Sequence, residues 1–67
     1  MNEIDVRGLS CPEPVMRVSK ALKENLIPMK ILLDSEASKE NVARLLSRSN
    51  KSFEITNESD YTIYIVK

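Results

Sequence analysis

The sequence predicts an α/β (α+β) domain built as a two-layer sandwich, with two helices on one face of a four-stranded mixed sheet. Strand-like apolar segments and two segments of helical periodicity follow one another in the order β-α-β-α-β-β. The chain has 67 residues, which is enough for one small domain. Because a domain of this size can hardly support three layers, both helices are expected on the same face of the sheet.

The first half of the chain contains a strand, a turn and a helix. Residues 4–6 alternate as Ile-Asp-Val and predict a short strand, which ends in a turn that needs a positive φ at Gly8. From Pro12 onward the apolar spacing becomes helical, and it predicts a helix over roughly residues 12–25. The apolar stripe of this helix consists of Val15, Val18, Ala21 and Leu22.

The second half contains three strands and a second helix. Residues 29–34 predict a strand after the break at Pro28. Ser38 is expected to cap a helix with the stripe Val42, Leu45 and Leu46, and Asn50 to end it in the left-handed conformation. Phe53 and Ile55 mark the third strand, and residues 61–66 the fourth. The open face of the sheet is expected to carry Leu32, Tyr64 and Val66, either as ordinary surface residues or as a docking patch.

The composition excludes several classes of site. The chain has 10 Lys plus Arg, 10 Asp plus Glu, no His, one Cys and one Gly. A structural zinc site lacks ligands, a Gly-rich phosphate loop lacks glycines, and no metal or other cofactor is expected. The zero formal net charge disfavours nucleic acid as a partner. The longest aliphatic run is Ile31-Leu32-Leu33 and no charged leader precedes an apolar stretch, so neither a signal peptide nor a membrane segment is expected. A lone Cys cannot form an intramolecular disulfide, so a cytoplasmic protein is expected.

Cys11 is the candidate reactive residue. If Pro12 opens the helix, Cys11 is the N-cap, where free backbone N–H groups and the helix dipole favour thiolate over thiol. Pro12 and Pro14 lack N–H groups, so only Glu13 and Val15 can donate from the first turn, while the proline rings stiffen the segment. The alternative is that this lone Cys is a small buried apolar residue.

Charged neighbours act on the thiol in both directions. Glu13 opposes ionisation by like charge, whereas Arg7 and Arg17 support it if they fold nearby; a modestly activated thiol is expected. Without His, the usual Cys–His nucleophile pair cannot form. Without a second Cys in the chain, a dithiol–disulfide redox cycle cannot take place. Passing on a sulfur atom needs neither group, because it is a thiol exchange limited by thiolate fraction and access.

The segment from Ile4 to Met16, which contains Arg7-Gly8-Leu9 and Cys11-Pro12-Glu13-Pro14, resembles the signature of the TusA family of sulfur carriers, also called SirA-like. The resemblance implies a two-layer sandwich over residues 1–67 as a single TusA-like domain. It also implies that Cys11 carries persulfide sulfur, with Arg7, Gly8, Pro12, Glu13, Pro14 and Arg17 shaping its surroundings.

The resemblance also implies partners. The donor in this family is a cysteine desulfurase or a rhodanese-like protein, and the acceptor is a sulfur-relay protein, for which a DsrE-like protein is one candidate. Such a carrier would act as a monomer, a sulfurtransferase-type protein without independent turnover. Residues 33–44 look closer to the YedF branch, which is linked to selenium metabolism and often carries a second, DsrE-like domain; this chain is then a single-domain member or an N-terminal domain.

Two further functions remain open from the sequence. One is a non-catalytic RNA-binding or protein-binding module, since the same element order occurs in the C-terminal domain of the third bacterial translation initiation factor. The other is a regulatory domain that docks through the open face of the sheet. A salt-dependent affinity for RNA that is unchanged by Cys11→Ser would favour the RNA-binding module over a sulfur carrier.

Overall fold

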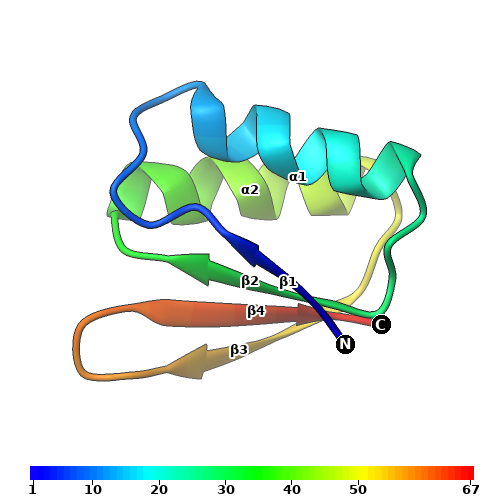
Figure 1. Ribbon diagram of the computed structural model, residues 1–67. Helices are drawn as coiled ribbons and strands as arrows, with labels where there is room; N and C mark the ends of the chain where they lie inside the picture. The colour runs from blue at the N-terminus through cyan, green and yellow to red at the C-terminus, as the bar shows by residue number, and fades with distance from the viewer.

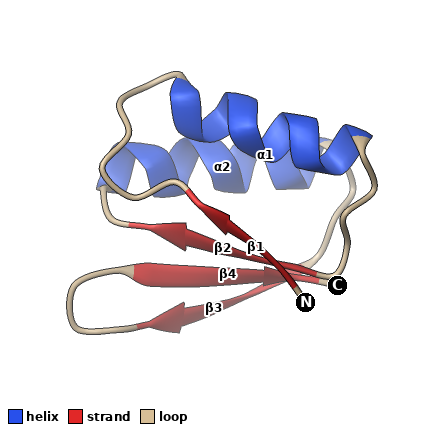
Figure 2. Ribbon diagram, viewed as in Figure 1, coloured by secondary structure: helices blue, strands red, loops and turns tan.

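Six elements follow one another in the predicted order in the computed structural model, which describes residues 1–67 (Figure 1). The strands are β1 (Asn2–Asp5), β2 (Met29–Leu33), β3 (Phe53–Asn57) and β4 (Thr62–Val66), and the helices are α1 (Glu13–Lys23) and α2 (Glu36–Arg48). Both helices lie on one side of the sheet, which confirms the two-layer prediction (Figure 2). None of the helices has the length and apolar character needed to cross a bilayer.

The sheet is mixed, in the order β1-β2-β4-β3. β1 pairs with β2 in parallel, because α1 carries the chain across the face of the sheet between them. β4 runs antiparallel to both β2 and β3, and the short turn between β3 and β4 makes them a hairpin. β1 and β3 are therefore the edges, and the chain leaves β1 into the loop that carries Cys11.

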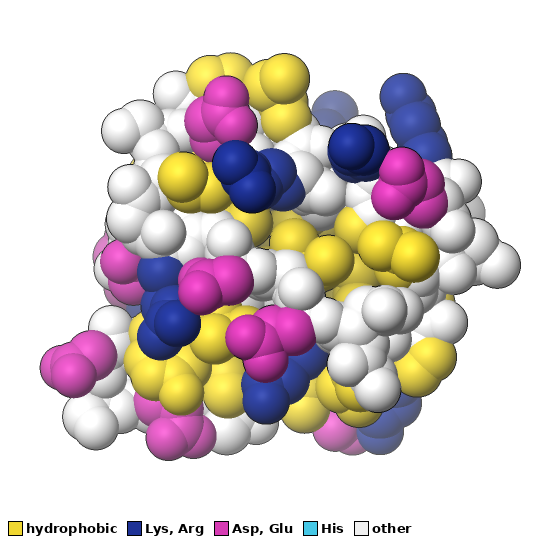
Figure 3. Space-filling model, in the orientation of Figure 1, with side chains coloured by type: hydrophobic (Ala, Val, Ile, Leu, Met, Phe, Trp, Pro, Cys, Tyr) yellow, Lys and Arg dark blue, Asp and Glu magenta, His cyan; other side chains and the backbone are white.

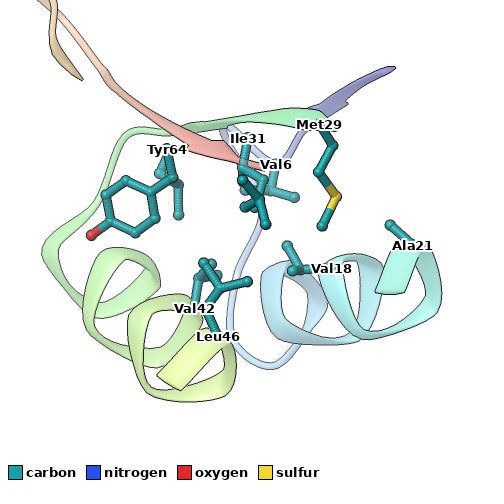
Figure 4. Packing of buried hydrophobic residues seen from close by; sticks show 10 residues of the cluster. Val6, Val18, Ala21, Met29, Ile31, Val42, Leu46 and Tyr64 are labelled. Carbon is teal, nitrogen blue, oxygen red and sulfur yellow. The ribbon is translucent and has the colours of Figure 1, made fainter. Parts of the chain in front are cut away.

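The core fills the space between the sheet and the helices (Figure 4). The predicted stripes supply it: Val18 and Ala21 of α1 and Val42 and Leu46 of α2 are buried, and Leu22 and Leu45 pack at its margin. These side chains meet the inward row of β2, which consists of Met29, Ile31 and Leu33.

The prediction that Tyr64 and Val66 lie on the open face of the sheet is wrong. Residues paired across strands share a face of a sheet, and Tyr64 pairs with Ile31 while Val66 pairs with Met29, so both point toward the helices. Tyr64 also donates its hydroxyl hydrogen to the Lys39 carbonyl on α2 at 3.2 Å, and burial raises the pKa of Tyr64 above its ordinary value.

Leu32 does lie on the open face, as predicted, and it pairs with Ile63 there. Because alternate residues of β4 share this face, Ile65 joins them. Neighbouring side chains nevertheless leave Leu32 only 5% exposed. Any docking patch on this face therefore consists of Ile63 and Ile65 of β4 and not of Tyr64 and Val66.

The helix ends agree with the sequence in part. α2 begins at Glu36, because Ser35 is its N-cap and accepts a hydrogen bond from the Ser38 N–H at 3.2 Å; the prediction of Ser38 as cap is wrong by one turn. Asn50 has φ of 58° just beyond α2, as predicted. α1 ends at Lys23 in the same way, with Asn25 at φ 55°, so it is shorter than predicted.

Candidate functional site

The loop between β1 and α1 is fixed at one point to the end of β2. Gly8 has φ of 76°, which confirms the predicted turn, and its N–H donates to Asp34 Oδ2 at 3.0 Å. Asp34 directly follows β2, so this bond joins the start of the loop to the middle of the sheet. The path of the chain toward Cys11 therefore depends on a left-handed residue at position 8.

Gly8→Ala is expected to destabilise the fold by about 1–2 kcal/mol, the cost of placing an L-residue in the left-handed region. Outside the adjacent residues of the chain, no atom lies within 4 Å of a Cβ built at this position, so the cost comes from the local backbone conformation and not from a clash with the rest of the fold. Urea-induced unfolding measures it, with Ser10→Ala in the same exposed loop as the control, for which little change is expected. Equal stability of Gly8→Ala and the unmodified protein would contradict the role of the turn.

Cys11 is exposed and lies two residues before α1. The N-cap of α1 is Pro12, with φ of −99° and ψ of 16°, so the prediction that Cys11 is the N-cap is wrong by one residue. The buried proline is Pro14, at the second position of α1, whereas Pro12 is exposed. Because Cys11 is exposed, the alternative of a buried apolar Cys is also wrong.

The backbone donors near Cys11 are fewer than the sequence indicates. The Glu13 N–H donates to the Ser10 carbonyl at 2.9 Å and closes a turn over residues 10–13. Of the two first-turn donors, Glu13 and Val15, only the Val15 N–H is then free. The next N–H along the helix, that of Met16, donates to the Pro12 carbonyl at 3.0 Å. The end of the helix thus contributes mainly its dipole to the surroundings of the sulfur.

The two predicted arginines are paired with acids. Arg7 binds Asp5 through Nη2 at 3.0 Å and Nε at 3.0 Å, and its guanidinium lies 4.7 Å from the centre of the Tyr61 ring. These hydrogen bonds from Arg7 hold the pKa of Asp5 below its ordinary value, and they raise that of Arg7. Arg17 lies 3.8 Å from Glu13 along α1.

The predicted site residues thus fall into separate groups. Cys11, Pro12 and Glu13 are adjacent in the chain and exposed. Gly8 and Pro14 act on the loop from its two ends, through the turn and through the core. No hydrogen bond joins Arg7 to Cys11, because Arg7 binds Asp5, whose pairing with Leu32 places it on the open face of the sheet.

The side chain that does face the sulfur comes from α2 and was not among the predicted site residues. Asn41 Nδ2 lies 4.0 Å from Cys11 Sγ, although the two residues are 30 positions apart in the sequence. Asn41 stands four residues before Leu45, whose side chain packs at the margin of the core. The one sequence signal for this proximity is that Asn41 is a polar residue one turn before Leu45, beside the apolar stripe of α2.

A shallow groove of about 550 Å³ begins beside the Cys11 loop and runs between α1 and β1. Glu13, Met16 and Arg17 line it from α1, and Ile4 and Asp5 line it from β1. Met16 is 57% exposed and gives this wall of the groove an apolar surface. On the face shown in Figure 3, acidic and basic side chains are intermixed around apolar patches, so this face has no large patch of a single sign of charge.

The residues around Cys11 restrict its chemistry. The chain has no imidazole to act as base and no second thiol, and the carboxylate next along the chain, Glu13, is paired with Arg17. An exposed thiol without a resident acid or base can attack sulfur, because thiolates are good nucleophiles and good leaving groups. The residues present therefore allow the exchange of a sulfur atom between thiols.

Comparisons with known proteins agree with this arrangement. The family described as "Sulfurtransferase TusA" matches residues 2–67. A protein of Archaeoglobus fulgidus, provisionally named a sulfur carrier protein, is 36% identical over 50 residues; the match spans 72% of this chain and 65% of that protein. The crystal structure of a SirA-like protein from Desulfitobacterium hafniense superposes with a TM-score of 0.83 at 28% identity, covering 98% of this chain and 96% of that one. The chain therefore belongs to the TusA (SirA-like) family of sulfur carriers.

Proposed function

We propose that this protein carries sulfur as a persulfide on Cys11 and passes it to an acceptor thiol. The observation that supports the proposal most directly is the exposure of Cys11 at the end of a constrained loop, with no His or second Cys that would favour another covalent chemistry. Membership of the sulfur-carrier family supports the same direction.

The transfer requires two exchanges of the same kind. The Cys11 thiolate attacks the outer sulfur of a donor persulfide, a new S–S bond forms on Cys11, and the donor leaves as a thiolate. An acceptor thiolate then attacks that outer sulfur, and Cys11 leaves as a thiolate. The sulfur atom keeps its oxidation level throughout, so neither an oxidant nor a reductant is consumed.

The proposed donor is a cysteine desulfurase or a rhodanese-like protein, and the proposed acceptor is a sulfur-relay protein, for example one with a DsrE-like fold. We place the protein in the cytoplasm, where a lone reduced Cys is the normal state. Residues 33–44 resemble the YedF branch of the family. On that basis the proposal includes a link to selenium, with residues 1–67 acting as one monomeric TusA-like domain.

Loading by a persulfide donor tests the proposal. The protein is incubated with a cysteine desulfurase and free cysteine, and its intact mass is measured before and after addition of a reductant. The expected result is an increase by one sulfur atom, which maps to the peptide containing Cys11 and disappears on reduction. Absence of this increase with several desulfurases, rhodanese-like donors and a small-molecule persulfide would contradict the proposal.

A further inference from the structure

The amide of Asn41 has a defined orientation toward Cys11. Its Nδ2 lies 4.0 Å from Cys11 Sγ, and its Oδ1 accepts a hydrogen bond from Arg44 Nη1 at 3.4 Å. A guanidinium has only donors, so it requires the carbonyl end of the amide, and the NH₂ end is left toward the sulfur. Arg44 lies one turn further along α2, so a single helix positions both groups.

The amide lies close enough to Cys11 to reach either the thiolate or a sulfur atom bonded to it. At 4.0 Å, Nδ2 is at the outer limit of a hydrogen bond to Sγ itself. The outer sulfur of a persulfide lies about 2 Å from Sγ, the length of an S–S bond. A sulfur atom does not fit on the line between Sγ and Nδ2, but an outer sulfur that is bonded to Sγ and lies to one side of this line stays within hydrogen-bond reach of the amide. There the amide N–H can donate to the negative end of the persulfide.

We propose that Asn41 is a positioning residue, which donates an N–H to the sulfur on Cys11, and that Arg44 holds its amide in this orientation. The part that concerns the carried sulfur rests on the proposed function above. The part that concerns the free thiolate does not, because the same N–H faces Cys11 before any sulfur is loaded. A donor to the charged form of a group favours that form.

The surrounding charges make this contribution separable. On α1, Glu13 is ion-paired with Arg17 at 3.8 Å, and on α2 the charged group in contact with the amide is Arg44. Substitutions at position 41 leave the Glu13–Arg17 pair unchanged but remove the hydrogen-bond partner of Arg44. Differences among variants at position 41 therefore report the amide together with Arg44, and a substitution of Arg44 itself reports the share of Arg44.

The test compares Asn41→Ala, Asn41→Asp and Arg44→Gln by the rate at which iodoacetamide alkylates Cys11 across a range of pH. Loss of the donor in Asn41→Ala is expected to slow alkylation about threefold at neutral pH. Asn41→Asp places a carboxylate about 4 Å from the sulfur, and a decrease of about fivefold is expected, with the midpoint of the pH profile at higher pH. Arg44→Gln is expected to fall between the unmodified protein and Asn41→Ala.

Arg48→Gln is the matched control, since it removes the same charge one turn further along α2, from an exposed residue. Its profile is expected to equal that of the unmodified protein. In the same variants, the share of protein loaded by a small-molecule persulfide is expected to fall in the order seen for alkylation. Circular dichroism confirms that each variant is folded, and Asn41→Ser replaces any variant that is not.

Unchanged alkylation profiles in folded Asn41→Ala and Asn41→Asp, or an equal loss in Arg48→Gln, would overturn the inference. The two proposals fail in different ways. If no persulfide donor loads the unmodified protein, the proposed function fails, while the alkylation profiles still decide whether Asn41 acts on the thiolate. If loading is normal and position 41 has no effect on either measurement, only this inference fails.

Discussion

Cys11→Ser is expected to abolish sulfur loading completely while leaving the stability of the fold unchanged. The chain has no other thiol, and a serine hydroxyl is not ionised at neutral pH, so it does not attack a persulfide. Because Cys11 is exposed and its side chain packs against no core residue, the change in unfolding free energy should stay within about 0.5 kcal/mol. Intact mass after incubation with a donor and urea-induced unfolding measure the two effects.

A second variant shows whether the position of the thiol matters as well as its presence. Ser10→Cys in the Cys11→Ser background moves the thiol by one residue, away from Asn41 and the start of α1. It is expected to load more slowly than the unmodified protein. Loading of Cys11→Ser itself, or loading of the shifted thiol at the full rate, would contradict the assignment of the site to Cys11.

Leu46→Ala is expected to remove most of the stability of the domain. Leu46 is fully buried where α2 meets the sheet, and shortening such a side chain costs about 2–5 kcal/mol through lost burial and the cavity that remains. A domain of this size has a total stability of roughly 3–10 kcal/mol. Urea-induced unfolding followed by circular dichroism should show a large shift of the midpoint or no folded baseline.

The control for this effect is Leu46→Met, which nearly conserves volume and should cost less than about 1.5 kcal/mol. Leu45→Ala, on the same helix but only partly buried, should lie between the two. A Leu46→Ala variant as stable as Leu46→Met would mean that the space between α2 and the sheet is not the main core.

Local patterns predicted the order of the elements correctly. The helical spacing of Val18 and Ala21, and of Val42 and Leu46, is set by contacts within a turn or two and identifies the buried faces. Gly8 and Asn50 mark conformations that few other residues adopt. Such signals depend on residues close in the chain, and the predictions made from them agree with the structure.

The errors concern pairings between distant residues. Residues 63–66 are all apolar or aromatic, so alternation cannot show which of them face the helices; the register with β2 decides it. Ser35 and Ser38 are both good caps, and the geometry of the turn selects the first. Pro12 is expected to open α1, but the helix begins at Glu13 with Pro12 as its N-cap, and the buried proline is Pro14 at the second helical position.

The site shows the same division. The turn at Gly8 and the exposure of Cys11 near the start of α1 depend on residues close in the sequence and agree with the prediction, while the role of Cys11 stays a prediction. The proximity of Asn41 depends on how α1 and α2 pack against each other, which no short pattern encodes. Arg7 was expected to act near the thiol, but Asp5, two residues earlier, provides a bidentate partner that holds it elsewhere.

A transfer experiment with labelled sulfur tests the central claim, that Cys11 holds sulfur in transit. The protein is loaded with labelled sulfur, separated from the donor, and mixed with an acceptor protein thiol. The label is expected to leave Cys11 at the rate at which it appears on the acceptor, with one sulfur atom transferred for each one lost. Label that stays on the protein, or that reaches the acceptor from the donor equally fast when Cys11→Ser replaces the unmodified protein, would contradict the claim.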